Sequence, residues 1–230
     1  MAINVTDENL VQDVSNVSTK KYKENLVKRT PYKIVKRITD ILFSTIGLII
    51  LMPIFAIIAI AIKIESKGPV FFKHTRIGKN GKIIKIYKFR SMVENAEDLI
   101  QKFTPEQMKE YKENYKLTDD PRITKIGNIL RKTSLDELPQ IINIIKGDLS
   151  IIGPRPVVQE ELEKYGENAP KFLSVTPGLT GYWAANGRSS TSYDERMEME
   201  LFYVDNMSFK LDVKVFFKTI LSVLKREGAM

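Results

Sequence analysis

The longest apolar stretch of the chain runs from Ile41 to Ile62 (ILFSTIGLIILMPIFAIIAIAI) and contains no charged residue. As a straight helix it would cover roughly 33 Å, which is about the hydrocarbon thickness of a bilayer. The pattern therefore predicts a membrane helix, with a buried helix of a soluble protein as the alternative. A signal peptide is excluded, because the stretch starts late, lacks a small-residue cleavage site and is followed by basic sequence.

Pro53 lies near the middle of this stretch, and basic residues flank the stretch on both sides. Proline removes a helical hydrogen bond and clashes with the preceding turn, so a kink is expected. Basic flanks are typical of the cytoplasmic face, and here both flanks qualify. We therefore expect a re-entrant helix that breaks at Pro53 and leaves the membrane on the side where it entered; a simple spanning helix is the alternative. The flanking residues expected to hold anionic headgroups are Lys36, Arg37, Lys63 and Lys67.

Outside this stretch the pattern predicts a small, mainly helical domain. Residues 1 to about 30 are polar and are interpreted as a flexible lead. Val70 to Arg90 is typical of a β-hairpin, because Asn80-Gly81 is a strong turn signal between apolar arms. Helices are predicted at Glu94 to Phe103, at Pro105 to about Leu117, at Val158 to Tyr165 and at Glu195 to Lys225. A capping box of Thr104 and Gln107 precedes the second of these helices, and the last is interrupted near residues 206–208.

The composition restricts the chemistry that the chain can perform. It has 36 Lys and Arg against 28 Asp and Glu, a formal net charge of +8, no cysteine and one histidine, His74. Thiolate and His-rich metal sites are thereby excluded, so a bound metal should be a hard, oxygen-liganded ion such as Mg²⁺. The charge suits nucleic acid, an anionic membrane or a phosphorylated substrate. Because no nucleic-acid-binding module is recognisable and the basic residues gather beside the apolar stretch, we expect no nucleic-acid partner.

Asp136 and Glu137 form an acidic pair within LRKTSLDELPQIINIIKGDLSIIGPRP, residues 130–156. One interpretation is structural: Ser134 to Glu137 matches a capping box, although Pro139 would then cost a helical hydrogen bond. The other is functional. An Asp at a helix N-terminus stays ionised and lies where a phosphate is attracted, and a carboxylate can act as a nucleophile.

Further basic elements surround this pair in the sequence. In Gly153-Pro154-Arg155-Pro156 two prolines fix the backbone, so Arg155 is presented from a rigid turn and suits a phosphate clamp; a plain turn is the alternative. Arg90 lies at the end of the strand predicted within KIYKFRSM, residues 85–92, and this segment could equally be an ordinary basic strand. Arg122 lies in DDPRIT, which could be an ordinary loop. Two further elements are Pro177 to Trp183, in which the Trp ring offers a stacking face, and Asn186 to Ser189, which contains Arg188.

The ordered set KFRSM, DDPRIT, the Asp-Glu pair, GPRP and PGLTGYW resembles the bacterial sugar transferases, which are monotopic polyprenol-phosphate phosphoglycosyl transferases. The resemblance covers about Pro31 to Ala229. It implies that a sugar-1-phosphate passes from a nucleoside-diphosphate sugar to a polyprenyl phosphate, and that the membrane helix is a hairpin hinged at Pro53. It further implies that Asp136 is the nucleophile and binds Mg²⁺, with Glu137 as its essential partner. The arginines implied as phosphate ligands are Arg90, Arg122, Arg131, Arg155 and Arg188.

One position departs from the family pattern. The family element commonly reads Gly-Tyr-Trp-Gln, whereas Ala184 follows Trp183 here. Substrate recognition through that position is therefore not carried over. The sugar is not readable from the residues, although the segment from Ser192 to Asn206 resembles members that use UDP-galactose or UDP-glucose.

These observations predict a small transferase in three parts: a polar lead (1–30), a basic lead-in with the re-entrant membrane helix (31–67) and a catalytic domain (68–230). The predicted fold class is α+β, mainly helical, with amphipathic helices at the membrane interface. The resemblance implies a UDP-sugar and undecaprenyl phosphate as partners, at the cytoplasmic face of the bacterial plasma membrane. An anionic membrane surface is expected as a further partner, and a homo-oligomer is compatible with the sequence. The alternative function is a non-enzymatic adaptor with a basic membrane surface.

Overall fold

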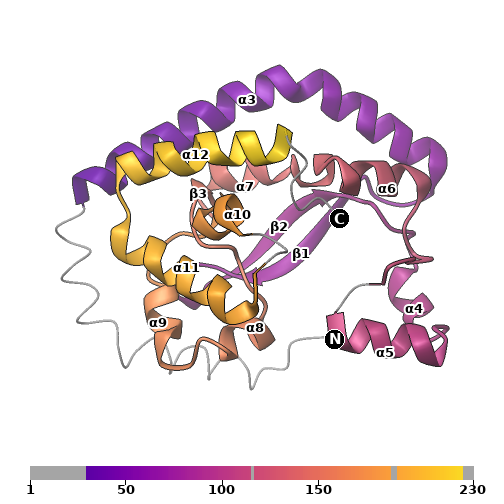
Figure 1. The fold of residues 1–230 in the computed structure, drawn as a ribbon. Helices are drawn as coiled ribbons and strands as arrows, with labels where there is room; N and C mark the ends of the chain where they lie inside the picture. The colour runs from indigo at the N-terminus through magenta and orange to yellow at the C-terminus, as the bar shows by residue number, and fades with distance from the viewer. Residues whose placement is uncertain (1–29, 115–116, 188–190, 225–230) are drawn as a thin grey trace. The chain divides into compact units, whose positions relative to one another are not determined.

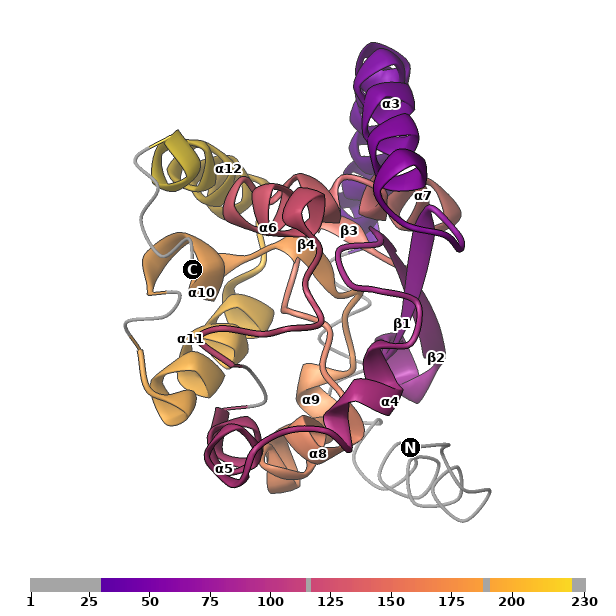
Figure 2. The same ribbon diagram turned by 90° about the vertical axis from the view of Figure 1, so that its right-hand side faces the viewer.

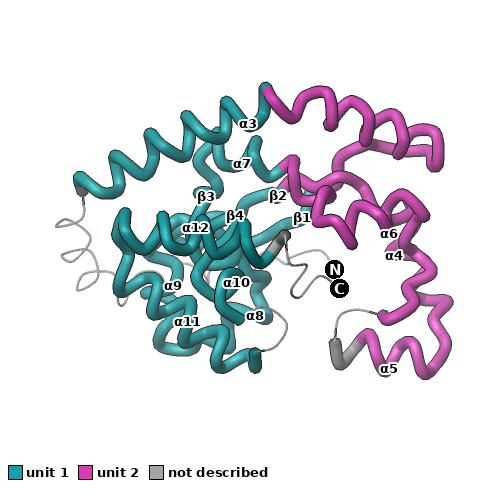
Figure 3. Tube along the Cα trace, turned by 45° about the horizontal axis from the view of Figure 1, so that its top comes forward, with its two compact units in different colours: residues 1–49, 73–86, 140–229 teal, residues 50–72, 87–139, 230 magenta. Residues whose placement is uncertain are grey.

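The computed structural model describes residues 30–114, 117–187 and 191–224 (Figure 1). The chain forms two compact units (Figure 3). Among the described residues, unit 1 comprises 30–49, 73–86, 140–187 and 191–224, and unit 2 comprises 50–72, 87–114 and 117–139. Within the described residues the fold is mainly helical with little sheet, so the predicted α+β class is confirmed. The predicted polar lead lies outside the described residues.

The apolar stretch forms part of one helix, α3 (Thr30–Glu65), with Pro53 inside it. Within the described part of the chain it is the one helix long and apolar enough to cross a membrane, and only 11% of its most apolar window is buried. Ile50 and Ile57 are 68% and 67% exposed. The alternative of a buried soluble helix is therefore wrong. The helix continues through Pro53. The kink at this proline, and entry and exit on one membrane face, stay predictions.

The predicted hairpin is confirmed. Strands β1 (Phe71–Ile77) and β2 (Ile83–Phe89) pair, and the short η1 turn (Lys79–Gly81) joins them. Asn80 and Gly81 have φ of 56° and 78°, the left-handed conformation that a tight hairpin turn requires and that these two residue types tolerate. The Gly78 N–H donates to the Lys82 carbonyl at 2.7 Å and closes the turn.

Unit 1 is built around two short parallel strands, β3 (Ser150–Ile152) and β4 (Gly178–Thr180). In Figures 1 and 2, α10 (Tyr182–Asn186) lies between α11 (Tyr193–Asn206) and α12 (Phe209–Leu224). One core cluster joins these elements through Ile152, Ala185, Tyr203 and Val215. The other helical segments of the unit are α7 (Gln140–Lys146), α8 (Gln159–Glu163), η3 (Gly166–Asn168) and α9 (Ala169–Phe172).

The predicted helical C-terminal region is confirmed in its outline. Helices α11 and α12 are separated at Met207 and Ser208, as the sequence indicated. Helix α12 is amphipathic and leaves a row of large apolar side chains exposed. That row consists of Phe209, Val213, Phe216, Phe217, Ile220 and Leu221.

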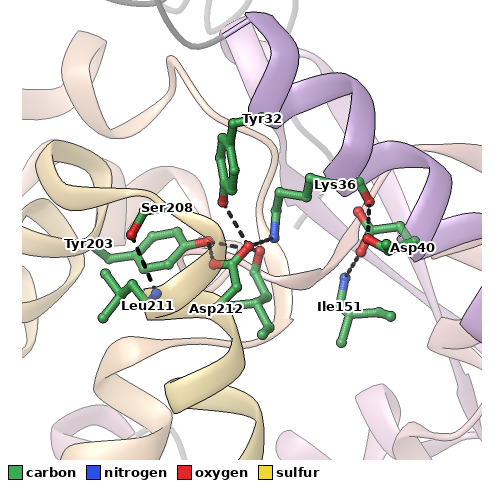
Figure 4. A network of polar contacts seen from close by, with 10 residues as sticks. Tyr32, Lys36, Asp40, Ile151, Tyr203, Ser208, Leu211 and Asp212 are labelled. Atoms are coloured by element: carbon green, nitrogen blue, oxygen red, sulfur yellow. Dashed lines mark hydrogen bonds and ion pairs between the residues drawn. The ribbon is translucent and has the colours of Figure 1, made fainter.

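The first turns of α3 are fixed to unit 1 by polar contacts (Figure 4). The Lys36 ammonium lies 2.7 Å from Asp212 Oδ2. The Arg37 guanidinium donates to the carbonyls of Ile144 and Ile145 at 2.6 and 2.8 Å, which caps the C-terminus of α7. Lys36 and Arg37 therefore serve the fold, and their expected role at lipid headgroups stays a prediction.

Unit 2 packs the second half of α3 against the residues that surround the acidic pair. Its core holds Ile58 and Ile62 of α3 together with Phe89 and Leu130, and Leu135 and Leu138 pack against the same cluster. The helical segments of the unit are α4 (Ala96–Ile100), α5 (Pro105–Asn114), α6 (Lys125–Lys132) and η2 (Leu135–Glu137). The Thr104–Gln107 capping box before α5 is confirmed by reciprocal bonds of 3.0 and 3.2 Å.

Two contacts hold helix α6 in place, one with Glu65 and one with the backbone of Ser91. The Glu65 carboxylate, at the end of α3, accepts the N–H groups of Lys125 and Ile126 at 2.7 and 3.0 Å, and so caps the first turn of α6. A Cβ on Gly127 would overlap the Ser91 carbonyl, so a glycine is required for the helix to approach that backbone. The last turn of α6 leads directly to the acidic pair.

Candidate active site

The acidic pair lies on a single 3₁₀ turn in unit 2, which is not the helix N-terminus that the sequence suggested. Ser134 before the turn is left-handed (φ 57°) and its side chain makes no capping bond. The Glu137 carboxylate accepts a 2.7 Å hydrogen bond from the Lys88 ammonium. The capping-box interpretation is therefore wrong, because Glu137 points at a strand residue and does not reach back to Ser134.

Lys88 contacts both members of the pair. Its ammonium lies 2.7 Å from Glu137 Oε1 and 3.9 Å from Asp136 Oδ2. It extends from β2, and it lies on the strand face that Ile84 and Ile86 share, two and four residues away. The pair therefore faces a half-buried cation that neutralises part of its charge.

Asp136 is buried, with an exposed fraction of 8%. Burial raises the pKa of the Asp136 carboxyl above its ordinary value, while the positive charge of Lys88 opposes that rise. The expectation that Asp136 is kept ionised by a helix N-terminus is not met, because burial outweighs the favourable contributions and the net direction is a raised pKa. Ionisation of Asp136 depends instead on the cations that surround it.

Arg131 is the second cation near Asp136. Its Nε donates to Ser91 Oγ at 2.9 Å, which fixes the guanidinium. Burial lowers the pKa of Arg131, whereas the charge of Asp136 works in the opposite direction. The structure therefore brings together Asp136, Glu137 and Arg131 from the predicted set.

Arg122 and Asp120 form a closed pair. The guanidinium donates to both carboxylate oxygens at 2.8 and 2.7 Å and lies over the rings of Phe103 and Tyr111, 5.1 and 5.0 Å from their centroids. Burial raises the pKa of Asp120, but the hydrogen bonds and charge of Arg122 outweigh it, so the pKa lies below its ordinary value. With its guanidinium buried in this pair, Arg122 holds the DDPRIT loop in place, and its role as a phosphate ligand stays a prediction.

Arg90 follows β2 and is buried under the turn that leaves α3. Its Nη2 donates to the carbonyl and hydroxyl oxygens of Ser66, both at 2.8 Å. Nε and Nη1 are buried and have no hydrogen-bond partner within the described part of the chain. Arg90 therefore retains donors that an anionic ligand would satisfy.

Arg155 belongs to unit 1, where its side chain is exposed on the turn after β3. Its backbone N–H donates to Glu200 Oε1 at 3.0 Å. Burial raises the pKa of Glu200 to about 7, against the opposing charges of Arg196 and Arg155. The folded chain thus holds this proton more tightly than the unfolded chain, so the contribution of Glu200 to stability falls as the pH rises from 4.5 to about 7.

The remaining predicted elements also lie in unit 1. Trp183 is in α10; its ring faces the Arg196 guanidinium at 4.7 Å and its N–H donates to Thr191 Oγ1 at 2.8 Å. The ring already has a cationic partner, so a stacking role toward substrate stays a prediction. Arg188 lies outside the described residues.

A metal would have two carboxylates available at the acidic pair. The described residues contain no group of three or more His, Cys, Asp and Glu side chains able to hold an ion. Magnesium is commonly held by one or two carboxylates together with substrate phosphates and water. Asp136 and Glu137 fit that donor set, so a divalent ion is compatible with the site once a phosphorylated substrate supplies further oxygens.

Sequence reasoning missed two side chains that the geometry singles out, Lys88 and Glu200. For Lys88 a signal existed, because alternation along β2 puts it on the inward face of Ile84 and Ile86. For Glu200 the signal was weaker: it lies four residues after Arg196, and both are buried on α11.

Comparisons with known proteins support a single family. The family model described as bacterial sugar transferase matches residues 31–226. Exopolysaccharide production protein ExoY of Sinorhizobium fredii is 44% identical over 85% of this chain and 88% of its own length. Undecaprenyl-phosphate galactose phosphotransferase of Salmonella typhimurium is 40% identical over 90% of this chain and 44% of its own length.

UDP-glucose:undecaprenyl-phosphate glucose-1-phosphate transferase of Escherichia coli is 39% identical over 82% of this chain and 40% of its own length. The chain thus spans most of the first relative and less than half of the other two. The match confirms the resemblance read from the motifs and the expected enzyme class, and it removes the adaptor alternative. The chain belongs to the bacterial sugar transferase family.

Proposed function

We propose that this protein is a phosphoglycosyl transferase that moves a sugar-1-phosphate from a UDP-sugar to undecaprenyl phosphate and releases UMP. Family membership supports the reaction class, and the relatives named for UDP-galactose, UDP-glucose and undecaprenyl phosphate support these substrates. The reaction would be the first membrane step in building a polysaccharide or another glycoconjugate.

The observation that carries this proposal is the packing of the acidic turn. Leu135 and Leu138, which flank Asp136 and Glu137, pack against the hydrophobic cluster that contains Ile58 and Ile62 of the apolar helix. The carboxylates are thereby held next to the end of a helix that exposes many of its other large apolar side chains. With the apolar helix in a bilayer, a lipid phosphate at the membrane surface would lie near this end of the helix, where both substrates could meet the acidic pair.

The proposed chemistry proceeds in two displacements. An ionised Asp136 oxygen attacks the sugar-bearing phosphorus of the UDP-sugar, the bond between this phosphorus and the bridging oxygen breaks, and UMP leaves with that oxygen. The phosphate of undecaprenyl phosphate then attacks the same phosphorus. The acyl–phosphate bond breaks, the Asp136 carboxylate is restored, and the product is a lipid diphosphate sugar.

The neighbouring residues would prepare these steps. Lys88 and Arg131 provide positive charge beside Asp136, which favours its ionised form and offsets the negative charge of the phosphates. Glu137, held by Lys88, is placed for proton or metal handling. Mg²⁺, held by Asp136 and the diphosphate, would neutralise phosphate charge when bound.

The proposal is tested by nucleotide release. Membranes that contain the protein should release UMP when both a UDP-sugar and undecaprenyl phosphate are present, with UDP-galactose and UDP-glucose as the first donors of a panel. EDTA should stop the release and Mg²⁺ should restore it, because the phosphate oxygens need a hard cation. The variant His74→Ala should keep the same metal dependence; loss of that dependence would contradict a carboxylate site.

A second proposal concerns the membrane. Basic residues flank both sides of Ile41–Ile62, and the exposed apolar row of α12 is accompanied by Lys210, Lys214 and Lys218. Both features suit attachment at the anionic cytoplasmic face, with α3 re-entering at Pro53.

Labelling of introduced cysteines checks this topology. The chain has no cysteine, so single replacements at Lys28 and Lys67 give clean reporters. We expect both positions to react with a membrane-impermeant reagent from the cytoplasmic side alone. Reaction of the two positions from opposite sides would establish a simple spanning helix and refute the re-entrant arrangement.

A further inference from the structure

The turn that carries Arg155 is pinned to the neighbouring strand. The Gly153 N–H donates to the Thr180 carbonyl at 2.9 Å, and the Gly178 N–H donates to the Pro154 carbonyl at 2.8 Å. A Cβ on Gly181 would overlap the Gly153 carbonyl, so a glycine lets the two segments approach. The first half of the turn is thus fixed by β4.

The peptide between Pro154 and Arg155 is restrained at both of its edges. Proline fixes its own φ, and Arg155 is confined to an extended conformation because Pro156 follows it. The Gly178 N–H holds the carbonyl edge of this peptide. The bond from the Arg155 N–H to Glu200 Oε1, at 3.0 Å, holds the opposite edge and so limits the tilt of the peptide that would swing the exposed Arg155 side chain.

Glu200 is an unfavourable residue for simple packing at this position. It is 1% exposed, and its second oxygen, Oε2, is buried without a hydrogen-bond partner in the described part of the chain. Its neighbours on α11, Tyr203 and Val204, belong to the apolar core. An apolar side chain would avoid the cost of burying a carboxyl, but it could not accept the Arg155 N–H.

We propose that Glu200 is a positioning residue, whose buried carboxyl sets the direction in which Arg155 is presented to a substrate phosphate. This inference rests on the proposed function, together with the role of substrate-phosphate ligand that the family resemblance implies for Arg155. Glu200 itself is too deeply buried to touch the substrate. Its effect reaches the reaction through the backbone of the GPRP turn.

The test compares kcat and KM for both substrates in four variants: Glu200→Leu, Glu200→Gln, Arg155→Ala and the double variant Glu200→Leu with Arg155→Ala. Glu200→Leu should lower kcat/KM by about 10-fold or more, because small displacements of a phosphate ligand are costly. The loss should affect the same substrate that Arg155→Ala affects. Glu200→Gln keeps an acceptor of the same shape and should retain activity near that of the natural protein.

In the Arg155→Ala background, Glu200→Leu should cause almost no further loss, because the two residues act through one contact. Glu198→Leu serves as the matched control: it is the same substitution on an exposed position of α11 and should leave activity unchanged. Should Glu200→Leu fail to fold, Glu200→Gln still decides the question, since a large loss in that folded variant overturns the role of the hydrogen bond.

The proposal is overturned if Glu200→Leu keeps full activity, or if its loss is equally large without the Arg155 side chain. Failure of the proposed function gives a different result, because the natural protein would then release no UMP, or Asp136→Asn would release it normally. Full activity of Arg155→Ala removes the phosphate role of Arg155, and the positioning role of Glu200 falls with it.

Discussion

Replacement of Asp136 by Asn is expected to reduce UMP release by at least about 10³-fold, because an amide cannot form the acyl-phosphate bond. The substitution keeps the shape of the side chain. It also leaves the short Lys88 contact intact, since that 2.7 Å bond goes to Glu137. The folded structure should therefore survive, and a turnover assay on membranes or detergent-solubilised protein isolates the chemical loss.

Two further variants serve as a second test and as a control. Glu137→Gln should lower turnover by about 10²-fold or more if Glu137 handles a proton. Asp148→Asn is the control, because Asp148 pairs with the exposed Lys82 at 3.2 Å and should change turnover little. Detection of a phospho-sugar adduct on Asp136 by mass spectrometry would support the covalent route, whereas normal turnover in Asp136→Asn would refute it.

Asp212→Ala is expected to cost about 3–5 kcal/mol of stability, the typical loss when one partner of a buried ion pair is removed. Asp212 lies in α12 and accepts hydrogen bonds from Tyr32, Lys36 and Tyr203, each at 2.7 Å (Figure 4). Tyr203 is fully buried, so its hydroxyl would lose this acceptor in the apolar core, and the Lys36 charge would lose its counter-ion. Denaturant unfolding in a fixed detergent measures the change.

Asp205→Ala provides the comparison. Asp205 forms an ion pair of nearly equal length with Lys171, 2.6 Å, but its side chain is 56% exposed. Exposed pairs contribute about 0–1 kcal/mol, so this variant should be close to the natural protein in stability. Equal losses in Asp205→Ala and Asp212→Ala would show that burial does not set the strength of the Asp212 cluster.

The sequence predicted those elements whose signals are local. The Asn80-Gly81 turn, the Thr104–Gln107 capping box and the interruption between α11 and α12 each depend on residues within a few positions of one another. The parallel pair of β3 and β4 was not predicted, because each strand has three residues and the pairing joins Ser150 to Gly178 across a connection that contains α8, η3 and α9. Such short strands leave no periodic signal.

In the candidate site, too, local motifs were informative and a long-range contact was missed. The motifs identified Asp136, Glu137 and Arg131, which the structure brings together in unit 2. The local pattern of Ser134 to Glu137 nevertheless predicted the wrong bond, because Glu137 pairs with Lys88, 49 residues away in the sequence. Tertiary contacts of this kind override a capping motif, and a single sequence does not reveal them.

The apolar helix is an integral part of the fold. A chain that began at residue 68 would lose Ile58 and Ile62 from the cluster behind the acidic turn and Glu65 from the first turn of α6. It would also lose Lys36 and Arg37, which join the start of α3 to unit 1. The apolar helix thus contributes contacts to each unit, and cutting it away would remove part of the core that supports the carboxylates.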